Sequence, residues 1–396
     1  MIVMALKLVN GGGVSFRSVG RIFAALNLSF NLKLRIPSHA TVLMWMKKQG
    51  VYTFKSKEFF ASEKWVLIID ESVQFGNKKL LVALAVNESK LRLQQALNYK
   101  DLIPLTIKAS ESWKSEAIKE EILSHIDVRQ ISYAVSDNGN NLKGCYQLMG
   151  LLHIEDVGHK FSWFIKQVFE KQIDFEGYTK HLSGLRGKLS LTRVAHIIPP
   201  NQRIISRFMN LTPLFKWGCR VLELLDHNRF DDEEVEKVKF VLQYRTFILN
   251  MGKLLATMNL VQKILKTKQL CIETVQLCHK ELEKITNDVD GEKIVQMIKN
   301  YLADNLQKLP QGVKGLCSSD IIESCFGKYK EVVKANKSVG ITDLCLSIAC
   351  LTSDNGYEQT KIMLETVKVK QVKQWKQKNI GETLLAKRNN LFRKTG

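Results

Sequence analysis

The chain has 396 residues, of which 45% are hydrophobic and 25% charged, without internal repeats or low-complexity tracts, so two or three ordinary globular domains are expected. Its 59 Lys and Arg residues against 39 Asp and Glu residues give a formal net charge of +20. A surplus of this size usually has a polyanionic partner such as DNA or RNA, the alternative being a generally basic protein. No apolar stretch reaches the ~20 residues of a membrane span. We therefore expect a cytoplasmic location and no membrane partner.

The eight cysteines show no C-x-x-C spacing. A chain of this length needs no disulfide bonds, so most of them are expected to be small buried side chains. His279 beside Cys278 has no second ligand pair at the spacing of a zinc finger, and a zinc site is therefore not expected there.

Two helices are expected near the start of the chain. Apolar residues recur at helical spacing over residues 15–27, with basic residues on the other side. A second helix is expected over residues 39–50, with Ser38 as its N-cap and Gly50 as its end.

These two helices suggest a helix-turn-helix DNA-binding region over residues 1–55. The alternative is an ordinary helical pair that packs on the next domain. If the region reads DNA, three side chains are candidates to face the major groove: His39, Thr41 and Lys48.

Residues 60–160 alternate between strand-like and helical segments. Strands are expected at 65–70, 80–86, 102–108, 131–137 and 151–156, and helices at 111–125 and 141–150. A hairpin turn at Gly76–Lys79 joins the first two strands. This order is that of an RNase H-like α/β core with a mixed five-stranded sheet, in which the first and fourth strands are neighbours.

From residue 160 to 317 the pattern changes to long helical periods, for example over 232–250 and 253–265, which predicts an all-helical insertion domain. The acidic run that begins at Asp231 is expected to start a helix. The core is expected to resume over residues 318–352, with a helix near 340–351. Residues 353–396 form a basic C-terminal tail, helical or partly disordered, that is expected to contact nucleic acid.

Two of the expected strands end on an aspartate, Asp70 and Asp137. An apolar strand delivers its last side chain to the rim of the sheet, where carboxylates of neighbouring strands can converge on a metal. Mg²⁺ prefers such oxygen ligands, and two ions ~3.5–4 Å apart can cleave phosphodiesters. Asp70 would bridge both ions, while Asp137 and Glu323, in a helix expected to begin near residue 318, would each hold one.

Each carboxylate has a plainer alternative. Asp137 begins an Asp-Asn-Gly turn sequence. Glu323 stands three residues after Asp320, so the two could form a helix capping box. Asp320 would be the ligand if the helix began one turn away.

Further candidates lie after the fifth expected strand and downstream. Asp156 and His159 could point toward the metal pocket, and Lys160 could pair with a backbone phosphate, unless Asp156 only caps a helix and His159 lies on the surface. Trp217 could stack on an extruded base, worth ~1–3 kcal/mol, although such a residue is more often part of a core. Two lysines one to two turns after Glu323 are candidate DNA contacts: Lys328 and Lys330.

Together these features resemble the DDE transposases, specifically bacterial insertion-sequence transposases whose RNase H-like core is interrupted by an insertion. The resemblance covers most of the chain. The step from Asp156 to His159 is similar to a signature of many cut-and-paste transposases. The gap from Asp137 to Glu323 is longer than in retroviral integrases, which an inserted helical domain explains. The Tyr-Arg-Glu-Lys signature of one large transposase class is absent around Glu323.

The resemblance implies cleavage of DNA at transposon ends and transfer of the 3′-OH to target DNA, with two Mg²⁺ or Mn²⁺ ions as cofactor. It also implies double-stranded DNA partners, synapsis by a homodimer or larger assembly, and a nucleoid-associated location in a bacterium. Two alternatives are an RNase H-like nuclease without strand transfer and a non-catalytic, transposase-derived DNA-binding protein.

Overall fold

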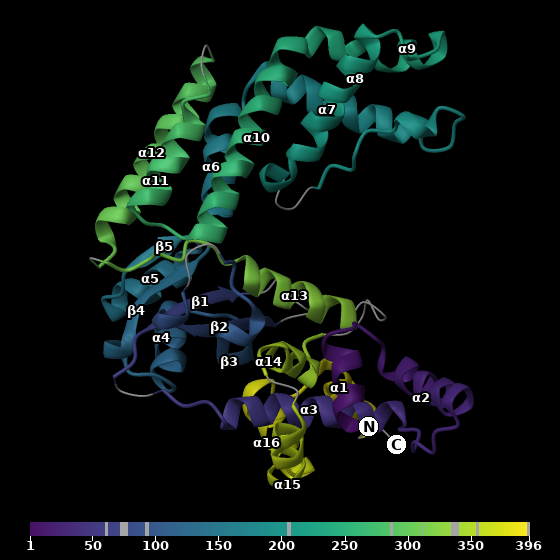
Figure 1. Ribbon diagram of the computed structural model, residues 1–396, viewed down its shortest axis with the longest axis vertical. Coiled ribbons are helices and arrows are strands. Elements are labelled where there is room, and N and C mark those ends of the chain that lie inside the picture. Colours follow the sequence, from purple (N-terminus) through teal and green to yellow (C-terminus); the bar gives the residue numbers. More distant parts are fainter. Residues whose placement is uncertain are drawn as a thin grey trace. The chain divides into compact units, whose positions relative to one another are not determined.

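The computed structural model describes residues 1–59, 62–71, 78–91, 95–203, 207–285, 288–310, 312–333, 340–353 and 356–393 (Figure 1). The chain forms two compact units. The first, here called the sheet unit, comprises residues 1–92, 97–154 and 319–396. The second, here called the helical unit, comprises residues 93–96 and 155–318. The sequence predicted the limits of an insertion near residues 160 and 317, close to the points where the chain passes between the units.

The sheet unit is built on a mixed five-stranded sheet. Its strands are β1 (Trp65–Glu71), β2 (Lys79–Asn87), β3 (Leu102–Ser110), β4 (Ile131–Ser136) and β5 (His153–Glu155), in the order β3-β2-β1-β4-β5. β1 runs antiparallel to β2 and parallel to β4, and β2 runs antiparallel to β3. The prediction that the first and fourth strands are neighbours is therefore confirmed. The predicted hairpin turn starts at residues 76 and 77, which lie outside the described residues.

Helices cover both faces of this sheet, which explains why β1 and β2 are almost continuously apolar. Leu67 and Ile69 pack with residues of α4 (Ser115–Leu123) and α5 (Asn140–Met149) in one core cluster. Val66 and Ile68, which alternate with them and so point the other way, are equally buried. On the sheet unit, α13 (Asp320–Val333) contacts β1, and α14 (Leu346–Thr352) contacts β3.

The N-terminal helices are α1 (Ile2–Asn10), α2 (Phe16–Phe30) and α3 (His39–Lys55). Ser38 caps α3 as predicted, because its hydroxyl accepts a hydrogen bond from the Thr41 backbone N–H at 3.1 Å. The predicted end of this helix at Gly50 is wrong. A Cβ at Gly50 would lie 2.8 Å from both Cβ and the carbonyl oxygen of Leu346 in α14, so this glycine permits close helix packing and does not end the helix.

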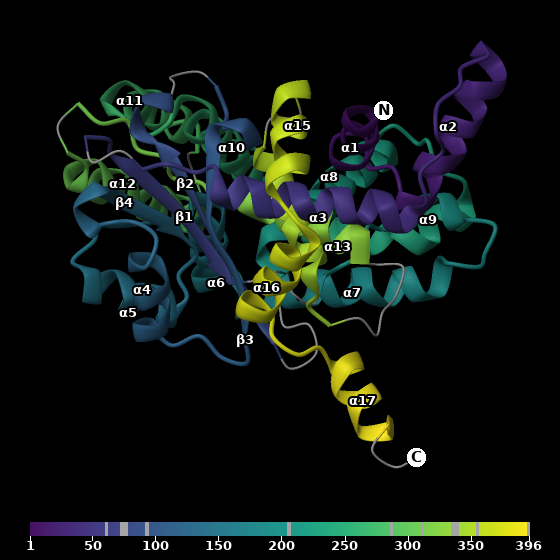
Figure 2. The ribbon, with the colours of Figure 1, turned by 90° about the horizontal axis from the view of Figure 1, so that it is seen from below.

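α3 is the central helix of a helical layer. It packs against α1, α2, α14, α15 (Tyr357–Thr366) and α16 (Val369–Asn379) (Figure 2). The connection from α2 to α3 spans residues 31–38, longer than the three or four residues typical of a helix-turn-helix. The helix-turn-helix stays a prediction.

The basic C-terminal segment was expected to be either helical or partly disordered, and the structure shows helices in it. It contains α16 and α17 (Leu384–Arg393). Val372 of α16 is buried in a cluster with Met46 and Leu346, and Trp375 packs against the same cluster. α16 is therefore part of the folded sheet unit.

The helical unit contains seven α-helices among its described residues: α6 (Val157–Phe169), α7 (Ile173–Leu189), α8 (Thr212–Asp226), α9 (Asp232–Val238), α10 (Arg245–Lys268), α11 (Ile272–Leu282) and α12 (Val289–Lys308). Asp231 and Glu234 form a capping box at the start of α9, as expected. The chain then passes through a 3-10 segment, Lys239–Tyr244, which interrupts the helical period expected over residues 232–250. α10 continues through Gly252, and this glycine permits close packing on α8, because a Cβ there would lie 2.6 Å from Cys219 Sγ.

The eight cysteines are all free thiols, and six are buried, as predicted: Cys145, Cys278, Cys317, Cys325, Cys345 and Cys350. Burial raises the pKa of the Cys278 thiol to about 12, so it stays protonated at neutral pH. Within the described ranges, no helix is both long and apolar enough to cross a bilayer.

A buried carboxylate ties α4 to β3. The Glu121 side chain is 9% exposed; it accepts a hydrogen bond of 2.6 Å from the Thr106 hydroxyl, pairs with Lys108, and lies 3.2 Å from His125 Nε2. Burial alone would raise the pKa of Glu121, but the hydrogen bonds from His125, Lys108 and Thr106 together lower it from 4.5 to about 2.

Gly50→Ala should lower the free energy of unfolding by about 1–3 kcal/mol, because the added methyl group forces Leu346 away. Gly327→Ala is the matched control, since a Cβ at this position in α13 meets no atom within 4 Å. The control should be neutral or gain up to about 1 kcal/mol from helix propensity. Denaturant unfolding measures both, and equal effects would contradict the role given to Gly50.

Glu121→Gln should destabilise the protein at pH 7 by about 1–3 kcal/mol, because it weakens a buried charged network. The folded pKa of Glu121 lies below its ordinary value of 4.5. Its contribution is therefore present above that pH and is lost as the pH falls toward about 2. Thermal unfolding from pH 7 to pH 3 should show the difference between parent and variant shrinking over this window; a difference independent of pH would contradict the assignment.

Candidate metal site and nucleic-acid contacts

The two strand-end aspartates occupy equivalent places on neighbouring parallel strands. The register pairs Leu67 with Ala134 and Ile68 with Val135. Asp70 lies two residues beyond Ile68, and Asp137 lies two residues beyond Val135. The same register, continued, places the two aspartates opposite each other at the carboxyl ends of β1 and β4, and both side chains are half-buried.

Negative charge gathers at these strand ends. Burial raises the pKa of the Tyr146 hydroxyl in α5, and the charges of Asp137 and Asp70 raise it further. Burial also raises the pKa of Glu71; Lys79, 3.4 Å away, opposes this effect and the charge of Asp137 adds to it. Both aspartates thus act on the same tyrosine, in agreement with their placement at neighbouring strand ends.

Glu323 lies in the first turn of α13, and its side chain is exposed. The prediction of a helix starting here is confirmed. Asp320 is the first residue of α13, whereas a capping box with Glu323 would need Asp320 one position before the helix. That alternative is therefore wrong. α13 contacts β1, the strand that ends with Asp70 and Glu71.

The carboxylates are arranged on the sheet unit without forming a closed ligand cluster. Among the described residues, no group of three His, Cys, Asp or Glu side chains is close enough together to hold a metal ion. The chemistry of the donors nevertheless fits a hard divalent cation, because oxygen ligands with surplus negative charge are what Mg²⁺ and Mn²⁺ bind. The residues that could supply such oxygen ligands are Asp70, Asp137 and, on α13, Glu323.

Asp156, His159 and Lys160 belong to the helical unit. Asp156 is 1% exposed, and its Oδ1 accepts a hydrogen bond of 2.8 Å from the His159 backbone N–H. It is the N-cap of α6, which is the plainer of the two roles expected for it. Lys160 Nζ lies 2.6 Å from Glu155 Oε2 and 5.0 Å from the centre of the Trp163 ring. A DNA phosphate at Lys160 would have to compete with Glu155.

The predicted DNA contacts of α3 lie near its start and middle. His39 and Thr41 are exposed, and Lys48 is partly exposed. Thr41 Oγ1 is 2.9 Å from Ser38 Oγ. Lys47, the neighbour of Lys48, pairs with Asp343 at 2.9 Å, so Lys47 helps to hold α3 in place.

Lys328 and Lys330 lie on α13 together with Glu323. Lys328 Nζ is 4.7 Å from the centre of the Tyr99 ring, and the Tyr99 hydroxyl lies 2.5 Å from Ser324 Oγ. Tyr99 thereby holds the exposed side of α13. This contact could not be predicted, since Tyr99 stands in a loop-like segment without periodicity.

Trp217 lies in α8 of the helical unit and is half-buried. Its Nε1 donates a hydrogen bond of 3.2 Å to the carbonyl oxygen of Ile197. One edge of the ring is therefore held by the fold, and stacking on a base stays a prediction.

The sheet unit thus carries two aligned aspartates, a neighbouring Glu71 that the sequence did not single out, and a helix with Glu323 and two lysines. Glu71 directly follows Asp70, so its position in the sequence was the available signal. In comparisons with known proteins, the chain matches no protein-family model and no curated protein.

Mg²⁺ should raise the melting temperature of the protein by a few degrees, because an ion that binds only the folded state stabilises it. Asp137→Asn should abolish most of this shift. In EDTA the same variant should melt above the parent, since one of two neighbouring like charges is gone. Glu120→Gln, which removes an exposed charge from α4, is the control. An unchanged Mg²⁺ shift in Asp137→Asn would contradict the metal site.

Proposed function

We propose that the protein is a metal-dependent DNA strand-cleaving and strand-transferring enzyme of the DDE transposase type. The observation that carries the proposal is the placement of Asp70 and Asp137 at the carboxyl ends of adjacent parallel strands. The net charge of +20 supports a polyanionic substrate.

An RNase H-like core is the proposed fold of the sheet unit. The strand order β3-β2-β1-β4-β5, with β2 antiparallel to β1 and β3, is compatible with it. The helical unit follows β5 and precedes α13 in the chain, which corresponds to the expected insertion between the second aspartate and the glutamate.

In the proposed mechanism, Asp70, Asp137 and Glu323 would hold two Mg²⁺ or Mn²⁺ ions. Bound ions of this kind activate an attacking oxygen and stabilise the leaving one. The carboxylates supply negative charge that the strands hold in place before DNA arrives, so little reorganisation is needed. Tyr146 stays protonated below them, because burial raises the pKa of its hydroxyl, and so it does not act as a base.

Lysines of the sheet unit would hold the phosphate backbone on either side of the scissile bond. Lys328 and Lys330 share α13 with Glu323, which places basic groups one to two turns from a proposed metal ligand. The proposal includes binding of transposon-end and target DNA, synapsis by a homodimer or larger assembly, and a place at the bacterial nucleoid.

Asp70→Ala and Asp137→Ala should each slow Mg²⁺-dependent nicking of DNA by at least about 100-fold, because each removes stabilisation worth several kcal/mol. DNA affinity, measured by fluorescence anisotropy, should change little in either variant. Glu120→Gln should nick at the parental rate.

The same reaction, run with DNA that carries the ends of the element, separates the alternatives. Products in which a 3′ end is joined to target DNA support transposition. Nicked ends without joined products would favour a nuclease. Nicking that survives in Asp70→Ala would overturn the catalytic proposal.

A further inference from the structure

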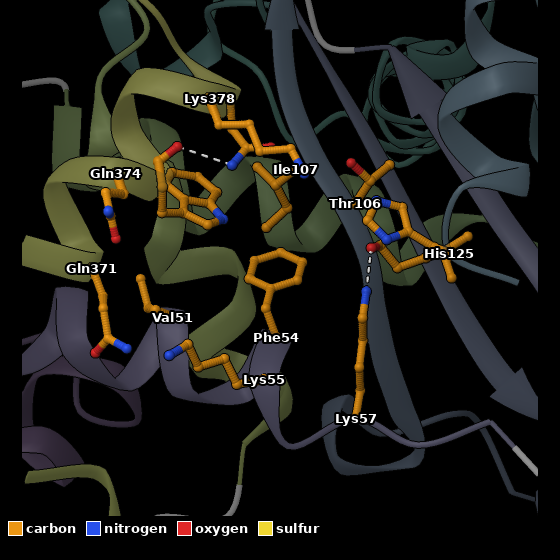
Figure 3. A pocket seen from close by; sticks show the side chains of 13 residues that line it. Val51, Phe54, Lys55, Lys57, Thr106, Ile107, His125, Gln371, Gln374 and Lys378 are labelled. Atoms are coloured by element: carbon orange, nitrogen blue, oxygen red, sulfur yellow. Dashed lines mark hydrogen bonds between the residues drawn. The ribbon is translucent and has the colours of Figure 1, made fainter. Parts of the chain in front are cut away.

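A cavity of about 400 Å³ opens in the sheet unit, lined by residues distinct from the candidate metal ligands (Figure 3). Its walls come from the last turns of α3, the middle of β3, and α16. A volume of this size lies in the range of sites that bind small molecules, roughly 300–1,000 Å³. The sequence placed these segments in the expected helix-turn-helix region, a core strand and the basic tail, and predicted no pocket among them.

The lining is positively charged. Lys55, Lys57 and Lys378 contribute to it, and the lining residues of the described chain include no Asp or Glu. The nearby carboxylate of Glu121 is already held by Thr106, Lys108 and His125. An anion would therefore meet the charges of three lysines, with no carboxylate among the lining residues to oppose it.

Lys57 is the most buried of the three lysines, since it is partly buried and Lys55 and Lys378 are exposed. Its Nζ donates hydrogen bonds to the carbonyl oxygens of Leu105, at 2.6 Å, and Pro104, at 3.4 Å. These partners carry no net charge. Burial lowers the pKa of Lys57 from 10.5 to about 8, while Glu121 acts to raise it and Lys378 to lower it. A bound anion would raise this pKa again, because a nearby negative charge favours the charged form of the lysine.

The pocket also has an aromatic wall. The rings of Phe54 and Trp375 lie with centroids 5.9 Å apart and planes 28° from parallel. Lys57 Nζ lies 5.2 Å from the centre of the Phe54 ring. In Figure 3 the Gln371 and Gln374 side chains stand on the α16 side of the pocket. Aromatic faces stack on bases, amides match the hydrogen-bonding edges of bases, and lysines bind phosphate.

We propose that this pocket binds a nucleoside phosphate, with the base against Phe54 and Trp375 and the phosphate near Lys57 and Lys378. The ligand has two possible sources, a free nucleotide or an unpaired nucleotide of a DNA strand. The binding chemistry is the same for both, and it does not require the metal site; the DNA source rests on the proposed function.

Isothermal titration of the full chain with AMP, adenosine and inorganic phosphate tests the pocket. AMP should bind saturably, and at least about tenfold more tightly than either part, because two sets of contacts act together. Lys378→Gln should weaken AMP binding about tenfold. Lys373→Gln, an exposed lysine of α16 outside the lining, should change it less than twofold.

The pH dependence tests Lys57. The charged groups that face it are Lys55 on α3, Glu121 and His125 on and after α4, and Lys378 on α16. The AMP phosphate is dianionic above pH 7, since its second pKa is about 6. Affinity should therefore fall as the pH rises past about 8, and Lys57→Gln should lack this fall. Circular dichroism shows whether Lys57→Gln is folded. If it is not, the comparison of Lys378→Gln with Lys373→Gln tests whether AMP binds in the pocket.

The proposal is overturned if AMP does not bind saturably, if adenosine or phosphate alone binds as tightly as AMP, or if Lys378→Gln and Lys373→Gln have equal effects. A blunt duplex and the same duplex with one unpaired 3′ nucleotide separate the two sources. Preference for the unpaired end, competed by AMP, assigns the pocket to DNA. Equal affinity for both duplexes, with AMP binding intact, assigns it to a free nucleotide.

Discussion

The parallel pairing of β1 with β4 is the constraint on which the candidate site depends. Burial of each large apolar side chain such as Leu67, Ile68 or Ile69 contributes about 1.5–3 kcal/mol, and all three are fully buried. Both faces of β1 are covered, so a slip by one residue would move each of these side chains into packing that fits a different side chain. Repulsion between two half-buried carboxylates a few ångströms apart costs only about 1–4 kcal/mol. The core therefore outweighs the repulsion and holds Asp70 and Asp137 at one edge.

The acidic edge formed by Asp70 and Asp137 lies within a strongly basic chain, and the two kinds of charge act over different distances. The net charge of +20 acts at a distance and attracts a polyanion. The carboxylates act only at contact, where they would repel phosphate unless cations lie between. Two lysines of the sheet unit are held in different ways. Lys328 Nζ lies 4.7 Å from the centre of the Tyr99 ring, whereas the partly buried Lys57 donates hydrogen bonds to backbone carbonyl oxygens.

The sheet was predictable because its strands are long apolar runs and its connections are short. The strand neighbours and the aspartates followed from that order alone. Glycine misled the prediction at the end of α3, because the sequence suggested that Gly50 ends the helix, whereas Gly50 permits close packing of α3 against α14. The pocket could not be predicted, since Lys57 and Trp375 lie 318 positions apart (375 minus 57) and meet only through tertiary folding. Hydrophobic periodicity predicts the secondary structure of one segment, and it does not show which distant segments come together.

The order of synthesis bears on how the sheet unit forms. All five strands are made before residue 156, yet α13, α14 and α16, which contact β1 and β3, come after the helical unit. At translation rates of about 5–20 residues per second, the nascent sheet has one apolar face uncovered for roughly ten seconds or more. Val66 and Ile68 would meet water or a chaperone during that time. Residues 155–318, which make up nearly all of the helical unit, can fold during synthesis, so the unit that carries the aspartates is completed last.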